Sequence, residues 1–323
     1  MRLRLIAQSF RISRESAVSA ERVSSYRQVP VSRPTGSGIR ATPVDGVAKS
    51  PPLFMFSTRL ATAAALLAVF ISALFYLPNR WWGLFLMPML LGASWEWCRL
   101  VRAGRAASWS FCVLVLGSAF ALWLRGRIDY GAGDDYAARI LAFTSVFWLL
   151  VAPIWLWRRW TTRSAFLHFV VGWIVLVPAW LALTRLQVWP AQFLALLGVV
   201  WFSDTGAYLA GKAWGKHKLA AAISPGKTWE GVAGAAVVVA VYYGVLSFCL
   251  GEWNWWSNGR GAVLFVGVAV LGIVGDLFES WLKRQAGAKD SGTLLPGHGG
   301  ILDRIDSMTA SMPFAAALLL LTQ

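Results

Sequence analysis

A stretch near residue 280 combines carboxylates and cations at helical spacing inside an apolar run. Five polar side chains follow one another at i, i+3, i+4, i+7 and i+8: Asp276, Glu279, Ser280, Lys283 and Arg284. This spacing places them on one face of a helix. A salt-bridge ladder that lets a helix end leave the lipid is the alternative, but such a ladder needs no aspartate as deep as Asp276. Because ionisable groups inside membrane segments mark functional sites, this face is a candidate site.

A second polar stretch, PGHGGILDRIDS at residues 296–307, follows closely. It supplies a histidine, two adjacent glycines, two aspartates and an arginine: His298, Gly299, Gly300, Asp303, Arg304 and Asp306. Adjacent glycines let the backbone approach a ligand closely. His298 suits a general base or a phosphate donor, and it suits equally well a loop histidine that only bonds backbone groups.

Two earlier segments carry further polar residues. WFSDTGAY ends the apolar run 190–210, so we expect Asp204 to be buried among small residues, with bonding to neighbouring helix backbone as its structural alternative. In ISPGKTWEG, Ser224 and Pro225 predict a helix start, with Glu230 in the early helix. Free backbone N–H groups at such a start, together with Lys227, would suit a phosphate. The segment is no Walker loop, because GxxxxGK[ST] is absent.

These segments offer hard oxygen ligands and cations, and they contain no Cys2His2 pattern. Such ligands favour Mg²⁺ over zinc. Carboxylates from separate helices, together with several lysines and arginines, are what metal-assisted phosphoryl or nucleotidyl transfer requires. The metal would bridge phosphate oxygens while the cations offset the developing charge. The residues alone do not choose a nucleotide base.

The whole chain has the composition of a membrane protein. Of its 323 residues, 57% are hydrophobic and only 14% are charged, whereas a soluble domain has about 25% charged residues. Long, continuous apolar runs predict an all-α, polytopic protein rather than a β-barrel, whose strands alternate. We expect about nine transmembrane helices, with eight or ten as alternatives, at residues 60–77, 81–98, 109–124, 138–157, 165–183, 190–210, 232–250, 261–282 and 308–321.

The basic residues indicate how the chain lies in the membrane. They give a net charge of +15 and cluster at the ends of the apolar runs. This arrangement favours contact with anionic lipid or phosphate, and it argues against a nucleic-acid partner. With the N-terminus in the cytoplasm, the basic connections alternate consistently to the cytoplasmic side. Loops 211–231 and 283–307 are then both cytoplasmic.

Residues 1–54 differ from the rest of the chain. They hold nine Arg or Lys and three acidic residues among Ser, Pro and Gly, without an apolar run long enough to insert. We predict a disordered basic leader or an over-extended N-terminus, with an organelle transit peptide as the third alternative. A transmembrane domain then covers residues 55–323.

Residues 280–307, SWLKRQAGAKDSGTLLPGHGGILDRIDS, closely resemble the signature of the phosphatidate cytidylyltransferases, also called CDP-diacylglycerol synthases. The matching residues are Ser280, Lys283, Arg284, Lys289, Asp290, Pro296, His298, Gly299, Gly300, Asp303, Arg304 and Asp306. The segments SDTGAY and SPGKTWEG also look like blocks of this family, and TRL after Met55 looks like its usual start. The resemblance covers residues 55–323.

The resemblance implies that CTP and phosphatidic acid react to give CDP-diacylglycerol and pyrophosphate, in phospholipid biosynthesis at the cytoplasmic face of the inner membrane. Asp276 and Asp303 would hold Mg²⁺, with a second, monovalent cation left open. Together with His298, Lys283 and Arg284, which would neutralise phosphates, they are the candidate catalytic residues. The other candidates would bind substrate: Asp204, Ser224, Lys227, Thr228, Glu230, Glu279, Ser280, Lys289, Asp290, Gly299, Gly300, Arg304 and Asp306. The oligomeric state is open, with a homodimer as one alternative.

Two other functions compete with this one. A CTP-dependent lipid kinase of the dolichol or phytol type would pass the γ-phosphate to a polyprenol alcohol. The complete run of KR, KD, PGHGG and DRID favours the cytidylyltransferase. A transporter would use Asp204 and Asp276 as ion or proton sites. Transporters often contain inverted repeats, and the sequence shows no clear internal repeat.

Overall fold

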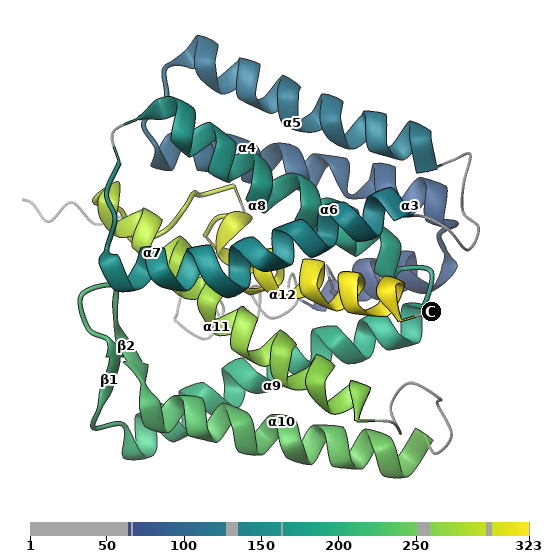
Figure 1. Ribbon diagram of the computed structural model, residues 1–323, viewed down its shortest axis with the longest axis vertical. Coiled ribbons are helices and arrows are strands. Elements are labelled where there is room, and N and C mark those ends of the chain that lie inside the picture. Colours follow the sequence, from purple (N-terminus) through teal and green to yellow (C-terminus); the bar gives the residue numbers. More distant parts are fainter. Residues whose placement is uncertain are drawn as a thin grey trace, which may run out of the picture. The chain divides into compact units, whose positions relative to one another are not determined.

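The computed structural model describes residues 64–65, 67–126, 135–162, 164–250, 259–294 and 299–322. These residues belong to one compact unit, residues 52–323. The unit is built almost entirely from helices, which confirms the all-α class (Figure 1). The predicted leader, residues 1–54, and the candidate catalytic residue His298 lie outside the described residues.

Ten helices are described from residue 79 onward. Their bounds are α3 (Asn79–Phe85), α4 (Met87–Leu100), α5 (Arg105–Gly126), α6 (Asp135–Val146), α7 (Ala152–Arg158), α8 (Ala165–Leu186), α9 (Pro190–Trp214), α10 (Trp229–Leu250), α11 (Arg260–Gln285) and α12 (Leu302–Leu321). A short π-helical turn, η1 (Phe147–Val151), joins α6 to α7 within one continuous span. Between α9 and α10, β1 (Lys218–Ala220) and β2 (Ser224–Thr228) form an antiparallel hairpin.

In the described part of the chain, seven helices are long and apolar enough to cross a membrane. They correspond to the last seven of the nine predicted spans, so the count of nine is not confirmed. The first predicted span contains a short apolar helix, Leu67–Tyr76, and lies partly outside the described residues. The second is divided into α3 and α4 at Leu86. Pro88 stands in the first turn of α4, where its missing N–H breaks no hydrogen bond, and it ends the preceding helix.

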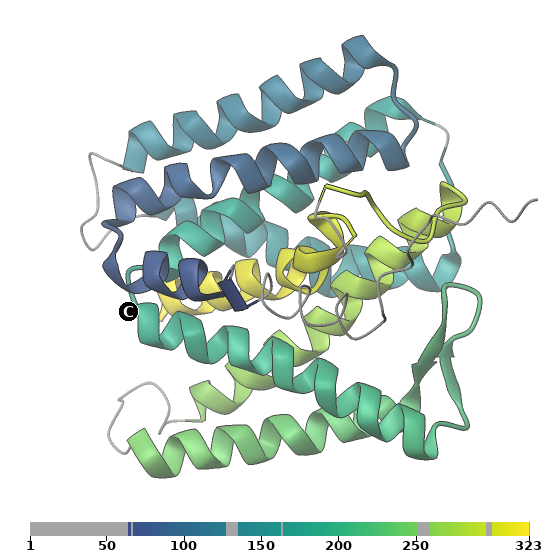
Figure 2. The ribbon, with the colours of Figure 1, turned by 180° about the vertical axis from the view of Figure 1, so that it is seen from behind.

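The helices alternate in direction, so one end of the bundle collects the polar loops. The ends of α9 and α11 and the starts of α10 and α12 lie at this end, which we call the polar end. Arg102 Nη2 donates to the Ala286 carbonyl oxygen over 3.0 Å, and Arg284 Nε donates to the Ile223 carbonyl oxygen over 3.2 Å. Figures 1 and 2 show the hairpin and the end of α11 on the same side of the bundle. The described parts of loops 211–231 and 283–307 therefore share one end of the bundle, and their predicted cytoplasmic location stays a prediction.

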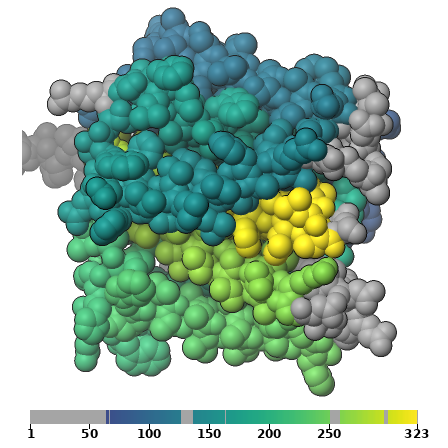
Figure 3. Space-filling model, viewed as in Figure 1, coloured from purple at the N-terminus to yellow at the C-terminus, as the bar shows by residue number. Residues whose placement is uncertain are grey.

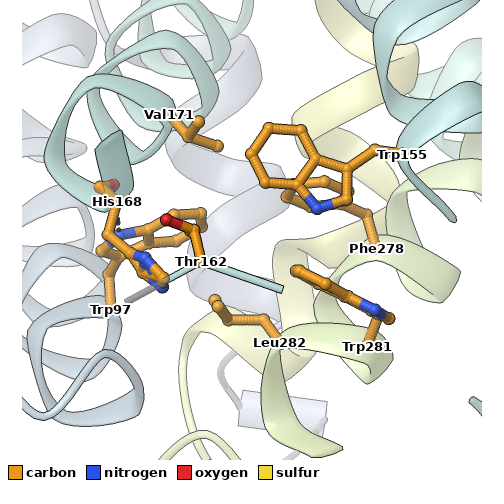
Figure 4. Close-up of a pocket in the computed structure, with 8 residues that line it drawn as sticks. All are labelled: Trp97, Trp155, Thr162, His168, Val171, Phe278, Trp281 and Leu282. Atoms are coloured by element: carbon orange, nitrogen blue, oxygen red, sulfur yellow. Dashed lines mark hydrogen bonds between the residues drawn. The ribbon is translucent and has the colours of Figure 1, made fainter. Parts of the chain in front are cut away.

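Aromatic packing sets the rotation of α11 about its axis. The Phe278 and Trp281 rings lie 6.0 Å and 5.9 Å from the Trp155 ring of α7, measured between centroids, in edge-to-face geometry. Figure 4 shows these three rings on one side of a small hollow, across from Trp97 and His168. Phe278 and Trp281 stand on the side of α11 that is opposite its polar residues. Their packing therefore turns the polar face of α11 toward α12.

Gly275 lets α11 and α12 approach each other beside Asp276. A Cβ atom at this position would lie 2.5 Å from the Asp306 carbonyl oxygen and 3.1 Å from the Ala310 Cβ atom. We therefore expect Gly275→Ala to lower the free energy of unfolding by about 1–3 kcal/mol, measured by thermal unfolding in detergent. Gly117→Ala in α5 is the control, because a Cβ atom there meets nothing within 4 Å and should be neutral or stabilising. Equal stability of the two variants would contradict the close crossing.

Candidate active site

Lys283 joins α11 to α12 at the polar end. Its Nζ atom lies 2.5 Å from Glu279 Oε2, one turn earlier on α11, and 2.7 Å from Asp303 Oδ1 on α12. All three side chains are largely buried, Glu279 most of all. We call these residues the Lys283 cluster. Two carboxylates surround one ammonium group, so the ionised cluster carries one excess negative charge and favours a further cation.

The carboxylate of Asp303 also collects backbone N–H groups. Its Oδ2 atom accepts hydrogen bonds from Gly300 N over 2.9 Å and from Ser291 N over 3.0 Å. Asp303 lies in the first turn of α12, where negative charge is favourable. Gly299 has a φ of +84°, which glycine adopts without strain. The backbone at Gly299 and Gly300 thus wraps a carboxylate of the protein itself, that of Asp303. The predicted close approach of these glycines to a ligand stays a prediction.

Glu96 of α4 holds the same loop from the other side. Its side chain is fully buried. Its carboxylate accepts hydrogen bonds from Ser291 Oγ over 3.0 Å, Ile301 N over 3.1 Å and Leu302 N over 2.8 Å. A Cβ atom on Gly300 would collide with this carboxylate. Glu96 therefore satisfies backbone donors that the start of α12 would otherwise leave unpaired.

The sequence indicates only part of the role of Glu96. A lone glutamate between two tryptophans of an apolar run must face protein or lie near the interface, and Glu96 contacts protein. Its link to the start of α12 was missed because Ile301 is 205 residues away along the chain. Such a pairing leaves no local pattern. A single acid in an apolar run is the only signal that could have pointed to it.

Asp276 forms a second ion pair at the polar end. Lys227 Nζ lies 2.6 Å from Asp276 Oδ2, and Ser280 Oγ donates to Asp276 Oδ1 over 3.2 Å. Asp204 of α9 and Asp306 of α12 both interact electrostatically with Asp276 and with Lys227. We call Asp204, Lys227, Asp276 and Asp306 the Asp276 cluster. Its three carboxylates outnumber its one lysine, which again favours a cation.

Asp204 is exposed, so the expectation that it is buried among small residues is wrong. The reason is the face through which α9 packs. Gly206 contacts α10, where a Cβ atom would lie 3.0 Å from the Gly234 carbonyl oxygen. Asp204 precedes Gly206 by two residues, or about 200° of helical rotation, and therefore lies on the other side of α9.

The segment SPGKT forms strand β2, which corrects the helix start predicted at Ser224 and Pro225. Ala220 of β1 lies opposite Ser224, and α10 begins only at Trp229. Serine and threonine are both good helix caps, so local preference does not choose between Ser224 and Thr228. Pairing with β1 explains why the helix begins later, at Trp229. The pairing satisfies the backbone hydrogen-bonding groups of this segment without a helix.

Thr228 caps α10, and this role is testable. Its buried hydroxyl group accepts a hydrogen bond from Gly231 N over 3.1 Å. We expect Thr228→Ala to lower the free energy of unfolding by about 1 kcal/mol, whereas Thr228→Ser should retain most of the stability. Thermal unfolding of the two variants in detergent measures the difference. Equal unfolding temperatures would mean that the cap contributes nothing.

The remaining candidate residues lie around the two clusters. Glu230 is paired with His217, whose Nδ1 atom lies 2.6 Å from Glu230 Oε1 at the base of the hairpin. Arg284 is exposed and bonds Ile223 of the hairpin. Three further charged residues of the loop and of α12 are exposed: Lys289, Asp290 and Arg304. The structure thus gathers all described candidates at the polar end, while their contacts with substrate stay predictions.

Comparison with known proteins identifies the family of the chain. Residues 57–322 match the cytidylyltransferase family. The chain belongs to this family. A phosphatidate cytidylyltransferase of Pseudomonas aeruginosa is 36% identical to it over 286 residues, which cover 82% of this chain and 97% of the relative. The phosphatidate cytidylyltransferase of Haemophilus influenzae is 33% identical over 279 residues, with 80% and 97% covered. That of Brucella suis is 49% identical over 127 residues, or 39% of this chain and 44% of the relative.

Membership of the cytidylyltransferase family bears out the resemblance of residues 280–307 to the family signature. It also shows that the chain is an enzyme. This disfavours the transporter alternative, because a transporter need not catalyse a reaction. With seven spanning helices in the described residues, this cytidylyltransferase is a multi-pass membrane protein. The family match begins at residue 57. The division into a leader, residues 1–54, and a transmembrane domain stays a prediction.

Proposed function

We propose that this cytidylyltransferase transfers CMP from CTP to phosphatidic acid and gives CDP-diacylglycerol and pyrophosphate. The observation that carries the proposal is the meeting of two lysine–carboxylate clusters at the end of membrane-spanning helices. A lipid headgroup and a water-soluble nucleotide can both reach such a place. Two relatives aligned over 97% of their own length bear the name of this activity.

The reaction exchanges one phosphorus–oxygen bond for another. An oxygen of the lipid phosphate attacks the α-phosphorus of CTP and forms the new bond. The bond from the α-phosphorus to the oxygen that bridges to the β-phosphate breaks, and pyrophosphate leaves. Lys227 and Lys283 offset the negative charge of the reacting phosphates, with Arg284 at the exposed side. Both lysines are already held by carboxylates, so little reorganisation is needed.

Asp276 and Asp303 are the residues that would hold Mg²⁺. Mg²⁺ is usually bound by one or two carboxylates together with substrate phosphates. The described residues contain no group of three or more His, Cys, Asp or Glu side chains that could hold a metal by themselves, so Asp276 and Asp303 would bind Mg²⁺ together with substrate phosphates. Each carboxylate contacts a lysine ammonium group, so both positions stabilise positive charge. When bound, Mg²⁺ would neutralise phosphate oxygens. A second, monovalent cation stays a prediction.

We place the polar end on the cytoplasmic side of the inner membrane, where CTP is available. The basic residues of loops 211–231 and 283–307 support this orientation, because positively charged connections favour the cytoplasmic side. Phosphatidic acid would enter from the bilayer and CTP from the water. A homodimer stays a prediction.

Cysteine labelling tests the orientation. Ala222 is exposed in the turn of the hairpin, at the polar end. Ala222→Cys should react with a membrane-impermeant maleimide only after the inner face has been opened. Native Cys249, which is exposed at the end of α10, is first replaced by serine. Labelling of Ala222→Cys in intact cells would reverse the orientation.

The activity is tested with CTP labelled at either of two phosphorus atoms. The purified chain is incubated with phosphatidic acid, a polyprenol and Mg²⁺, and the lipid phase is extracted. Label from the α-phosphorus should enter the lipid, and label from the γ-phosphorus should remain in the water as pyrophosphate. Transfer of the γ-label to a polyprenol would instead identify the kinase. Absence of label from every lipid would overturn the proposal.

A further inference from the structure

An apolar groove runs between α10 and α11. Its cavity volume is about 220 Å³. Five of its twelve lining residues are alanines, and the others are apolar or aromatic. These small side chains keep the two helices from filling the space between them. Figure 3 shows that α10, in green, and α11, in lime, both reach the surface on one face of the bundle.

One end of the groove is lined by residues that are near the Asp276 cluster in the chain. Ile273, which lines this end, precedes Asp276 by three residues and so shares its side of α11. Val232 lines the same end from the first turn of α10, shortly after Lys227. The opposite end is lined by Ala262 and Tyr243. From Ala262 to Ile273 the groove runs for about 16 Å along α11, or about half of the ~30 Å hydrocarbon thickness.

We propose that this groove holds one acyl chain of phosphatidic acid while the lipid phosphate lies at Lys227. The proposal rests on the proposed function and adds to it a site for the lipid tail. Lys227 supplies the positive charge that a phosphate requires at the head of the groove, and the lining supplies an apolar slot one leaflet deep. Since lipid tails are as apolar as the lining, occupancy gains little from the hydrophobic effect. The groove instead fixes the depth and direction of the headgroup.

Two other grooves fit this ligand less well. A groove between α9 and α10 contains Glu230 and has no lysine or arginine among its lining residues, so it offers no cation for a lipid phosphate. A groove lined by α5, α6 and α8 contains Arg125 near the end of α5. That end lies away from both lysine–carboxylate clusters. Of these three grooves, the one between α10 and α11 joins an apolar slot to Lys227 and Asp276.

Filling the groove tests the proposal. Val270 lines the groove and is 50% exposed, so Val270→Trp can fill it without opening the core. Val241→Trp is the control, because Val241 lies on α10 outside the groove and is 61% exposed. Activity is measured on dioleoyl and on dihexanoyl phosphatidic acid. We expect Val270→Trp to lower kcat/KM for the dioleoyl lipid about tenfold, with less than about a twofold change for the dihexanoyl lipid. Val241→Trp should change neither.

The other outcomes overturn the proposal in distinguishable ways. Equal losses on both lipids, or no loss on either, would show that the groove does not hold the chain. Equal losses together with a change from dimer to monomer in detergent would assign the groove to a contact between two copies. If the wild-type protein labels neither lipid, the proposed function itself fails.

Discussion

Replacing Asp276 or Asp303 with asparagine is expected to lower the rate of CDP-diacylglycerol formation about a thousandfold or more. Asparagine keeps the shape of the side chain but removes the charge that would bind Mg²⁺. The loss of one carboxylate from a hard-cation site costs several kcal/mol of transition-state stabilisation, and ~4 kcal/mol corresponds to about a thousandfold in rate. Binding of phosphatidic acid should survive in part, because Lys227, Lys283 and Arg284 remain.

The two variants should differ in stability. Asp303 bonds Lys283 and the backbone of Ser291 and Gly300, so Asp303→Asn should also lower the unfolding temperature. Among the described residues, Asp276 bonds only the side chains of Lys227 and Ser280, so Asp276→Asn should unfold closer to wild type.

The assay is transfer of α-label from CTP into lipid across a series of Mg²⁺ concentrations. Arg80→Gln, which removes an exposed charge at the start of α3 and away from the polar end, is the control and should keep wild-type activity. Near wild-type rates with unchanged Mg²⁺ dependence in both variants would show that the metal assignment is wrong. Asp204 and Asp306, the other carboxylates of the Asp276 cluster, would then be tested first.

Local spacing was enough to predict the polar face of α11. Residues three and four apart share a helix face whatever surrounds the helix, so Glu279 and Lys283 had to be neighbours. Continuous apolar runs were also enough to predict the last seven spans, because the length of an apolar run indicates a spanning helix whatever surrounds it. The approach of Asp303 to Lys283 was predicted only as a shared function, because the crossing of α11 and α12 depends on Gly275 and on the packing of Phe278.

Features that depend on contacts between residues far apart in the chain could not be predicted from the sequence. The hairpin exists because β1 pairs with β2, and neither strand predicts the other. Asp204 is exposed because α9 packs against α10 through its other face. Both faces of α9 are rich in small or apolar residues, so the sequence does not indicate which face packs. The break at Leu86 divides a run that is apolar on both sides. In each case tertiary contact, rather than local preference, decides the outcome.

Glu96→Gln is expected to damage both the fold and the site. The carboxylate of Glu96 accepts hydrogen bonds from Ser291 Oγ, Ile301 N and Leu302 N, and a glutamine offers one oxygen and an NH₂ group in its place. At least one buried donor then loses its acceptor, at a cost of about 1–3 kcal/mol. The loop and the start of α12 should loosen together, and Asp303 stands in that first turn.

Stability and metal dependence together separate the two effects of this change. A loss of folded protein alone lowers the maximal rate and leaves the Mg²⁺ concentration for half-maximal activity unchanged. If Glu96 positions Asp303, that Mg²⁺ concentration should rise about tenfold or more in Glu96→Gln, at equal amounts of folded protein. Ser291→Ala, which removes one of the three donors and leaves the carboxylate, should show a smaller shift in the same direction. A wild-type Mg²⁺ dependence in Glu96→Gln would restrict Glu96 to the fold, and a wild-type unfolding temperature as well would contradict the buried hydrogen bonds.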